Sequence, residues 1–292
     1  MSLRAEEFPL PEDPYDTVIG GIGSTEVRAG QTLLDIARSF DLGHDQIIAA
    51  NPSLNRWVPP VGAAVVLPAR YILPPGPRSG IVLNVAELRL YYYPPSSDVV
   101  LTYPVSIGGL DWRTPLGTTR ITSKEVDPAW YPPRSIRREH LAEGDELPSM
   151  IPGGAEDNPL GHYALKLGIG SYLIHGTDER RSFGIGMRVS HGCVRMYPED
   201  IEELFYLVSN GTSVRIIDAP IKVGWRRGVL FVEAHRPVEF EELEAIPPPS
   251  LDTVYRLIEK ATQPSDVIEE EQLDSVLQEA SGIPHPVGRR AG

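Results

Sequence analysis

The segment Ser190-His191-Gly192-Cys193 holds the only cysteine of a 292-residue chain. A thiol becomes a strong nucleophile as the thiolate, which a nearby histidine produces by accepting the proton. A single cysteine cannot form a disulfide within the chain, nor a zinc site that needs several cysteines. The segment therefore predicts a cysteine nucleophile for covalent catalysis; the alternative is a small buried apolar side chain.

Two histidines could accept the thiol proton. His191 lies two residues before Cys193. On an extended backbone that is roughly 6–7 Å, too far for a direct hydrogen bond unless the turn at Gly192 folds the chain. His175 ends a predicted strand, and a strand–loop–strand return would bring it face to face with Cys193. We therefore expect His175 to be the base, with its other ring nitrogen bonded to the backbone carbonyl of Gly176; the alternative is a structural histidine.

The residues beside the thiol suggest how a substrate would be held. Gly192 lets the backbone turn, so that the amides of Gly192 and Cys193 could form an oxyanion hole. Arg195 could bind a substrate carboxylate, or it could support the loop through a salt bridge. His175, His191 and Cys193 could instead ligate zinc together with a water, but nothing supplies a clear second shell, so we expect no metal.

The elements that must position these residues are predicted to be strands. Short apolar runs rich in β-branched and aromatic residues alternate with turn signals from Gly80 to Asp218, which is typical of a sheet-rich sandwich or barrel. One helix is well marked within this part. It starts at Pro198, ends at Asn210-Gly211, and places four apolar residues on one face: Ile201, Leu204, Phe205 and Val208.

An earlier stretch predicts a small strand–helix–helix–strand unit over 25–70. Its first helix begins with a capping box of Thr32 and Asp35. The stretch resembles a LysM domain through these residues: Val27, Gly30, Thr32, Leu33, Ile36, Ala37, Phe40, Ile47, Ala50, Asn51, Pro52, Gly62, Val66 and Pro68. The resemblance implies binding of N-acetylglucosamine-containing glycans in a groove between 30–32 and 51–54, with four candidate residues: Gly30, Thr32, Asn51 and Pro52. The alternative is a packing module that has lost its grip on glycan.

The region from about 80 to 218 resembles the L,D-transpeptidase catalytic domain, the YkuD family. The resemblance rests on His175, fourteen intervening residues and the run 190–195, together with "LNVAELRLYYY", "TPLGTTRI" and "YPEDIEELFYLVSNGTSVRI". It implies a mainly β, sandwich-like mixed sheet with one or two helices. With the LysM-like unit in front, the chain looks most like the periplasmic proteobacterial branch.

The resemblance also implies a reaction. Cys193 attacks the carbonyl of the meso-diaminopimelate residue of a peptidoglycan tetrapeptide stem, and D-alanine leaves with a proton from His175. The acyl group then passes to an amine, either a second diaminopimelate (a 3→3 cross-link) or a lysine of an outer-membrane lipoprotein. Ser190 and His191 support the site, residues 177–188 form a wall or lid, and Thr177 and Tyr163 are candidate substrate contacts. No metal or organic cofactor is implied.

Composition excludes some partners. The chain has 40 acidic and 27 basic residues and a net charge of −13, which argues against nucleic acid and gives no reason to expect an anionic membrane surface. No apolar run approaches the ~20 residues of a spanning helix. The resemblance implies an exported, periplasmic or cell-envelope protein. The first residues lack the apolar stretch of a signal peptide, so we expect the native signal to be absent from this sequence.

Five segments are expected: an extended or loosely packed N-terminal segment (1–24), the LysM-like domain (25–70), a Pro-rich linker (71–80), the catalytic domain (81–218) and a C-terminal extension (219–292). The extension is predicted to be partly helical with a disordered end, either docked on the core or solvated. Removing residues 1–70 is expected to weaken binding to cell-wall sacculi while sparing turnover. Two other functions stay open, a non-catalytic wall-binding protein and an L,D-carboxypeptidase that transfers to water.

Overall fold

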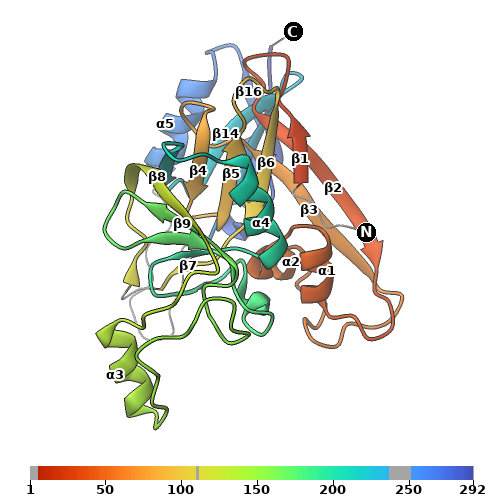
Figure 1. Ribbon diagram of the computed structural model, residues 1–292. Coiled ribbons are helices and arrows are strands. Elements are labelled where there is room, and N and C mark those ends of the chain that lie inside the picture. The colour runs from red at the N-terminus through yellow and green to blue at the C-terminus, as the bar shows by residue number, and fades with distance from the viewer. Residues whose placement is uncertain (1–5, 110–111, 237–250, 292) are drawn as a thin grey trace.

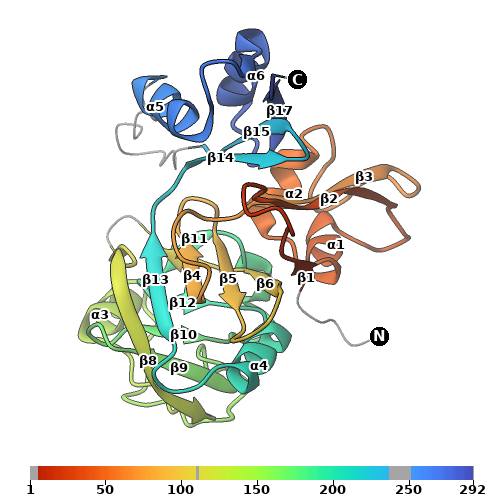
Figure 2. The same cartoon turned by 90° about the horizontal axis from the view of Figure 1, so that it is seen from above.

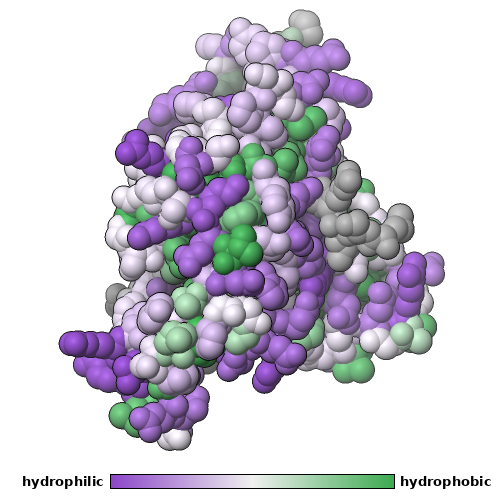
Figure 3. Space-filling model, viewed as in Figure 1, coloured by the Kyte–Doolittle hydropathy of each residue, from purple (hydrophilic) through white to green (hydrophobic). Residues whose placement is uncertain are grey.

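The computed structural model describes residues 6–109, 112–236 and 251–291, which form a mainly β structure (Figure 1). Seen from above, the chain forms three neighbouring units: an N-terminal unit, a central catalytic sheet, and a C-terminal unit in blue (Figure 2). The face seen in Figure 1 is largely hydrophilic, as expected from the high charge (Figure 3). No helix in the described ranges is long and apolar enough to cross a membrane.

The N-terminal unit has the predicted order of elements: β2 (Val18–Glu26), α1 (Leu33–Ser39), α2 (His44–Ala50) and β3 (Ala64–Ile72). The Thr32–Asp35 capping box is present, and the helices pack their apolar faces on the two-stranded sheet. The sheet pairs Val18 with Ile72, so the unit is wider than the predicted 25–70. The first part of β2 was not predicted, because it contains several glycines and glycine is depleted in strands. Its hydrogen-bonded ladder to β3 stabilises it nonetheless.

The predictions for the flanking segments need correction. The N-terminal segment is not loosely packed, because β1 (Glu6–Pro9) pairs with β6 (Val99–Pro104), and Val18 and Ile19 are buried. The linker is shorter than predicted, since Tyr71 and Ile72 belong to β3 and residue 80 already opens β4. Pairing with strands distant in sequence makes these segments ordered.

The central unit is a nine-stranded mixed sheet in the order β1-β6-β5-β4-β13-β8-β9-β10-β12. Its remaining strands are β4 (Gly80–Asn84), β5 (Arg89–Tyr93), β8 (Gly117–Val126), β9 (Tyr163–Leu167), β10 (Leu173–His175), β12 (Val194–Arg195) and β13 (Ser213–Ile217). A separate pair is formed by β7 (Ile107–Gly108) and β11 (Arg188–Ser190), which run parallel. Together these strands bring the two segments of the predicted catalytic motif into one sheet.

Three short helical segments accompany this sheet. The predicted helix is α4 (Pro198–Leu207), which starts with proline and packs Ile201, Leu204 and Phe205 into the main core. Helix α3 (Arg134–Ala142) was not predicted and projects from the body of the molecule (Figure 1). The 3-10 turn η2 (Ser182–Gly184) lies within the loop that follows β10.

The C-terminal unit has its own sheet, in the order β14-β15-β17-β16, and its own core. Its elements are β14 (Ile221–Arg226), β15 (Val229–Ala234), α5 (Leu251–Ala261), β16 (Val267–Ile268), α6 (Glu270–Glu279) and β17 (His285–Arg289). The extension is partly helical, as predicted, through α5 and α6, and residues 237–250 lie outside the described part of the chain. The predicted disordered end is wrong for 285–289, because β17 pairs with β15 and β16 and buries Val287.

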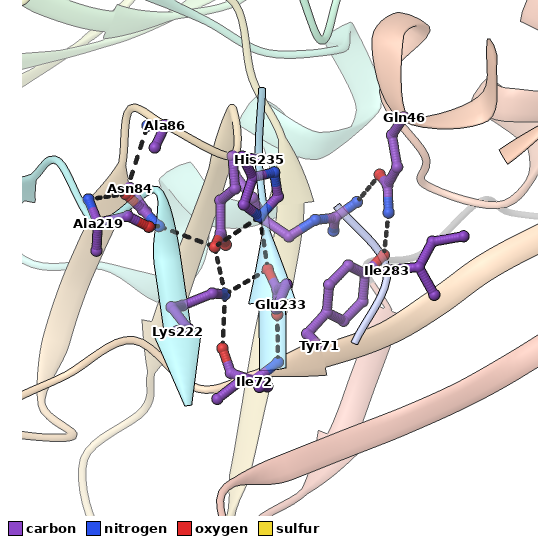
Figure 4. Close-up of polar contacts among 12 residues, drawn as sticks. Gln46, Tyr71, Ile72, Asn84, Ala86, Ala219, Lys222, Glu233, His235 and Ile283 are labelled. Carbon is purple, nitrogen blue, oxygen red and sulfur yellow. Dashed lines mark hydrogen bonds and ion pairs between the residues drawn. The ribbon is translucent and has the colours of Figure 1, made fainter. Parts of the chain in front are cut away.

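A buried polar network joins the three units (Figure 4). The Lys222 ammonium contacts Glu87 of the β4–β5 turn, lies 2.8 Å from Glu233 and donates to the Ile72 carbonyl at 2.6 Å. Glu233 also accepts from the Ile72 amide at 2.7 Å and lies 2.7 Å from the His235 ring. The C-terminal unit is therefore docked, because the buried Glu87 carboxylate of the central unit has the Lys222 ammonium of the C-terminal unit as its charge partner.

Candidate active site

The parallel ladder between β10 and β12 brings His175 and Cys193 together. The register pairs Ile174 with Val194 and His175 with Arg195. Since successive residues of a strand alternate between faces, Ile174 and Val194 point into the main core, and His175, Cys193 and Arg195 share the other face. The predicted strand–loop–strand return is confirmed. Arg195 is the residue opposite His175, and Cys193 lies two residues before it, so His175 and Cys193 are diagonal neighbours.

The His175 ring is buried, with the backbone of Gly176 and of Leu160 as hydrogen-bond partners. Its Nδ1 lies 2.6 Å from the Gly176 carbonyl oxygen, as the sequence predicted. A carbonyl only accepts, so Nδ1 carries the proton and Nε2 keeps a lone pair. Burial, and next the charge of Arg195, lower the pKa of His175 to about 3. The imidazole is therefore neutral near pH 7 and able to take a proton.

The Cys193 thiol is also kept neutral. Burial raises its pKa, while hydrogen bonding with the Leu173 backbone and the charge of Arg195 act in the opposite direction. In the described part of the chain, no hydrogen bond joins the thiol to the His175 ring. The resting site therefore holds a neutral thiol and a neutral imidazole, and not a thiolate–imidazolium pair.

Hydrogen bonds fix the turn before the thiol. The Ser190 hydroxyl donates to the Cys193 carbonyl at 2.5 Å and accepts from the Gly192 amide at 3.2 Å. Thr114 donates to the Gly192 carbonyl at 2.9 Å. Gly192 has φ +101, and a Cβ there would lie 2.7 Å from the Tyr172 ring, so only glycine fits.

This turn changes the predicted oxyanion hole. The Gly192 amide is occupied by Ser190, so its prediction as an oxyanion donor is wrong for this conformation. The Cys193 amide forms no hydrogen bond within the described residues and is left as the available donor. Thr114 and Tyr172, which shape the turn, were missed because no local pattern links them to it.

His191 points away from the thiol. Its Nε2 lies 3.0 Å from a carboxylate oxygen of Glu139 on α3, and its ring centroid lies 5.5 Å from that of Trp112. Its side chain is 35% exposed. His191 therefore ties the catalytic turn to the projecting helix, in agreement with a supporting role. The sequence analysis did not predict the contacts of His191 with Glu139 and Trp112. The helix α3, which carries Glu139, was not predicted either.

Two predicted substrate contacts lie elsewhere. Ala164 pairs with His175, so its neighbour Tyr163 faces the opposite side of the sheet. There the Tyr163 hydroxyl donates to Glu202 at 3.0 Å and its ring packs on Phe205 of α4. The prediction for Tyr163 is therefore wrong. Thr177 follows the catalytic strand but is only 3% exposed, so its side chain does not line an open surface.

Arg195 is brought to the site. Its charge acts on both His175 and Cys193, and its Nε is buried without a hydrogen-bond partner in the described structure. An unpaired guanidinium nitrogen beside the thiol suits a substrate carboxylate or carbonyl.

The comparisons with known proteins agree with this geometry. The pattern of the YkuD L,D-transpeptidase catalytic domain matches residues 78–216. The chain is 39% identical to the probable L,D-transpeptidase YcfS of Escherichia coli, over 99% of this chain and 90% of that protein. The chain belongs to the L,D-transpeptidase family. It is also 37% identical to the probable L,D-transpeptidase YbiS of E. coli (97% and 92% covered) and 38% to ErfK/SrfK of Salmonella typhimurium (96% and 90%).

The predicted glycan residues of this L,D-transpeptidase divide into two groups. Asn51 is buried, and its amide bonds the Ile47 carbonyl and both backbone groups of Val66 at 2.8–2.9 Å. The Thr32 side chain is likewise used in the capping box. These two side chains serve the fold, so as glycan contacts they are wrong. Gly30 and Pro52 remain exposed.

The same region contains exposed apolar side chains that the sequence reading missed. The Leu33 amide donates to the Arg56 carbonyl at 3.0 Å, which brings the two predicted groove segments together. Directly after Arg56, Trp57 is 54% and Val58 77% exposed. An exposed tryptophan at this place is a candidate surface for a sugar ring.

The zinc alternative does not fit the geometry. His191 turns to Glu139, so it does not converge with His175 and Cys193. Among the described residues, the one group of three possible ligand atoms within 4.8 Å is Glu87, Glu233 and His235. The Lys222 ammonium contacts both carboxylates there, so this cluster is an ion-pair network that already contains its cation.

Proposed function

We propose that this L,D-transpeptidase acts on peptidoglycan with Cys193 as nucleophile and His175 as general base. The observation that carries the proposal is their placement on neighbouring parallel strands, on one face, with His175 Nδ1 held by Gly176. With the Nδ1 proton directed at Gly176, the ring lone pair lies on Nε2, which supports its role as the base. The family membership supports the reaction class, and the local geometry supports the proposed roles of these residues.

The first half-reaction forms a thioester. Cys193 Sγ attacks the carbonyl carbon of meso-diaminopimelate, on its L-centre, while His175 Nε2 takes the thiol proton. The Cys193 amide donates to the oxygen of the tetrahedral intermediate. The C–N bond to D-alanine then breaks, and His175 returns the proton to the leaving amine. Because both groups start neutral, proton transfer accompanies the attack and does not precede it.

The second half-reaction transfers the acyl group. An amine attacks the thioester, His175 accepts a proton from it, and the thiol is restored. We propose an amine of a second diaminopimelate, giving a 3→3 cross-link, or a lipoprotein lysine as the acceptor, in the periplasm. Water as acceptor would make the same site an L,D-carboxypeptidase.

The N-terminal β2–α1–α2–β3 unit is proposed to be a LysM domain that holds the enzyme on glycan. Its exposed groove residues Gly30 and Pro52, with Trp57 beside them, support this role. Binding through this unit would raise the local concentration of stem peptides around the active site.

The proposed reaction is tested by mass spectrometry of products from purified disaccharide-tetrapeptide, with Cys193→Ala as the control. A dimer formed with loss of one D-alanine establishes transpeptidation by this thiol, and tripeptide without dimer indicates hydrolysis or a different acceptor. If neither protein gives any product, the chain is a non-catalytic wall-binding protein.

A further inference from the structure

The N-terminal unit contacts both segments that flank the catalytic strands, through Arg38 of α1. Its guanidinium bonds Glu199 at 2.7 and 2.8 Å and Glu179 at 2.7 and 3.2 Å. Glu179 lies in the loop directly after β10, which ends with His175. Glu199 lies in the first turn of α4, which begins three residues after Arg195 of β12. One side chain therefore spans the exits of both catalytic strands.

The same loop is held at a second place by α2. The His44 amide donates to the Ile185 carbonyl at 2.8 Å, and the Asp45 amide to the Gly186 carbonyl at 3.4 Å. The backbones of Gly43 and Gly186 pack so closely that a Cβ on Gly186 would lie 2.4 Å from Gly43 Cα. The loop after His175 is thus fixed between η2 and β11 by the N-terminal unit, and not by the catalytic sheet alone.

The loop in turn sets the surroundings of Arg195. Asp178 and Arg181 form an ion pair at the start of the loop. Both charges act on Arg195, whose own charge acts on Cys193 and His175. A shift of the loop would therefore change the field at the thiol without any direct contact to it.

From these contacts we propose that Arg38 is a positioning residue of the transpeptidase reaction, acting through Glu179 and Glu199 on the loop 177–188. The proposal rests on the function proposed above. It revises the expectation that residues 1–70 form a separable module, because their removal would release the loop beside the catalytic histidine. The N-terminal unit then serves turnover on soluble substrates as well as binding to sacculi.

The test compares Arg38→Gln and Arg38→Lys with a matched control, Arg70→Gln. Arg70 belongs to the same unit but bonds the Pro284 carbonyl of the C-terminal unit at 3.3 Å. Two quantities are measured: kcat and KM on soluble disaccharide-tetrapeptide, and the pH dependence of Cys193 alkylation by iodoacetamide. Arg38→Gln is expected to lower kcat about tenfold or more with a smaller change in KM, and to shift the alkylation profile.

The variants separate positioning from simple loss of structure. Arg38→Lys should recover part of the rate, since lysine keeps the charge but cannot bond both carboxylates in a fork. Arg70→Gln should leave both quantities unchanged. If Arg38→Gln fails to fold, Glu179→Gln takes its place; this side chain is 72% exposed, and its loss should still lower kcat and shift the profile.

The outcomes also separate this inference from the proposed function. An inactive wild-type enzyme on this substrate overturns both. An active wild type with Arg38→Gln and Glu179→Gln indistinguishable from it in kcat and in the alkylation profile overturns the positioning role alone. Equal losses in Arg70→Gln and Arg38→Gln would show general loosening of the unit and would also overturn it.

Discussion

His175 and Cys193 lie on a diagonal of the β10–β12 ladder, because the parallel register pairs His175 with Arg195 and not with the thiol residue. Diagonal neighbours on one face of a sheet are roughly 7–8 Å apart at the backbone, a span that an imidazole side chain can bridge. The same register places Arg195 beside both groups, where its positive charge opposes protonation of the ring and favours thiolate. The geometry therefore assigns different roles to the two histidines of the motif.

Replacing each histidine by alanine tests this assignment. His175→Ala is expected to lower kcat by about 100-fold or more, as for the loss of a general base. His191→Ala should lose far less, because its ring bonds Glu139 and lies away from the thiol. Steady-state kinetics on disaccharide-tetrapeptide measure both, with circular dichroism as the control for folding. Equal losses would mean that the base is wrongly assigned.

The pH dependence of activity follows from the resting protonation states. His175 has a pKa of about 3 and the thiol a pKa above its usual range, so the neutral pair persists from mildly acidic to alkaline solution. We expect kcat/KM to be flat through pH 6.5, without an acid limb near the ordinary histidine pKa. A fall in kcat/KM between pH 7 and pH 6, over a range in which the enzyme stays folded, would instead indicate a thiolate–imidazolium pair.

The same shift predicts acid sensitivity of the fold. The folded-state pKa of His175 lies below its unfolded value of about 6.5, so the unfolded state binds more protons between these values. Stability is therefore present above pH 6.5 and falls as the pH drops toward 3, by up to about 1.4 kcal/mol per pH unit from this residue. Urea titrations from pH 7 to 4 measure it. Replacing His175 by glutamine should flatten the slope; an unchanged slope would contradict the burial of a neutral ring.

The junction network predicts a large effect of one buried lysine. Lys222→Met removes the ammonium that contacts the buried carboxylates of Glu87 and Glu233, which should cost about 3–5 kcal/mol of unfolding free energy. Lys260→Met is the matched control on the exposed face of α5 and should cost at most about 1 kcal/mol. Equilibrium denaturation compares them. Similar midpoints for the two variants would show that the network does not hold the C-terminal unit.

The N-terminal unit gives a prediction that separates fold from glycan binding. Asn51→Ala removes the bonds to Ile47 and Val66 and should lower stability by about 1–3 kcal/mol. Trp57→Ala should leave the melting temperature nearly unchanged but weaken cosedimentation with insoluble sacculi, since this ring is exposed. Undiminished cosedimentation of Trp57→Ala would contradict the proposal that this tryptophan binds glycan.

Much of this architecture could be predicted because its signals are local. The capping box at Thr32 and the proline at the start of α4 are recognised from neighbouring residues, and the spacing from His175 to Cys193 carries a long family motif. The bond from His175 to the Gly176 carbonyl was also predictable, because a histidine base needs its other nitrogen fixed.

The remaining features depend on contacts between distant segments. Nothing near His191 in the sequence indicates Glu139, which lies 52 positions earlier on an unpredicted helix. Strand β17 contains proline and glycine and becomes a strand only because β15 and β16 pair with it. The error for Tyr163 has a similar cause, since its face is decided by the register of β9 against β10.

The proposed mechanism requires a thioester at Cys193. We would incubate the enzyme with disaccharide-tetrapeptide without an added amine acceptor, quench it rapidly in acid, and measure the intact mass and the modified peptide. The proposed mechanism predicts an added mass on Cys193 equal to that of the substrate minus D-alanine. This adduct should be absent from Cys193→Ala and should form far more slowly in His175→Ala. Tripeptide or dimer produced at full rate by Cys193→Ala, with no adduct on the wild type, would contradict it.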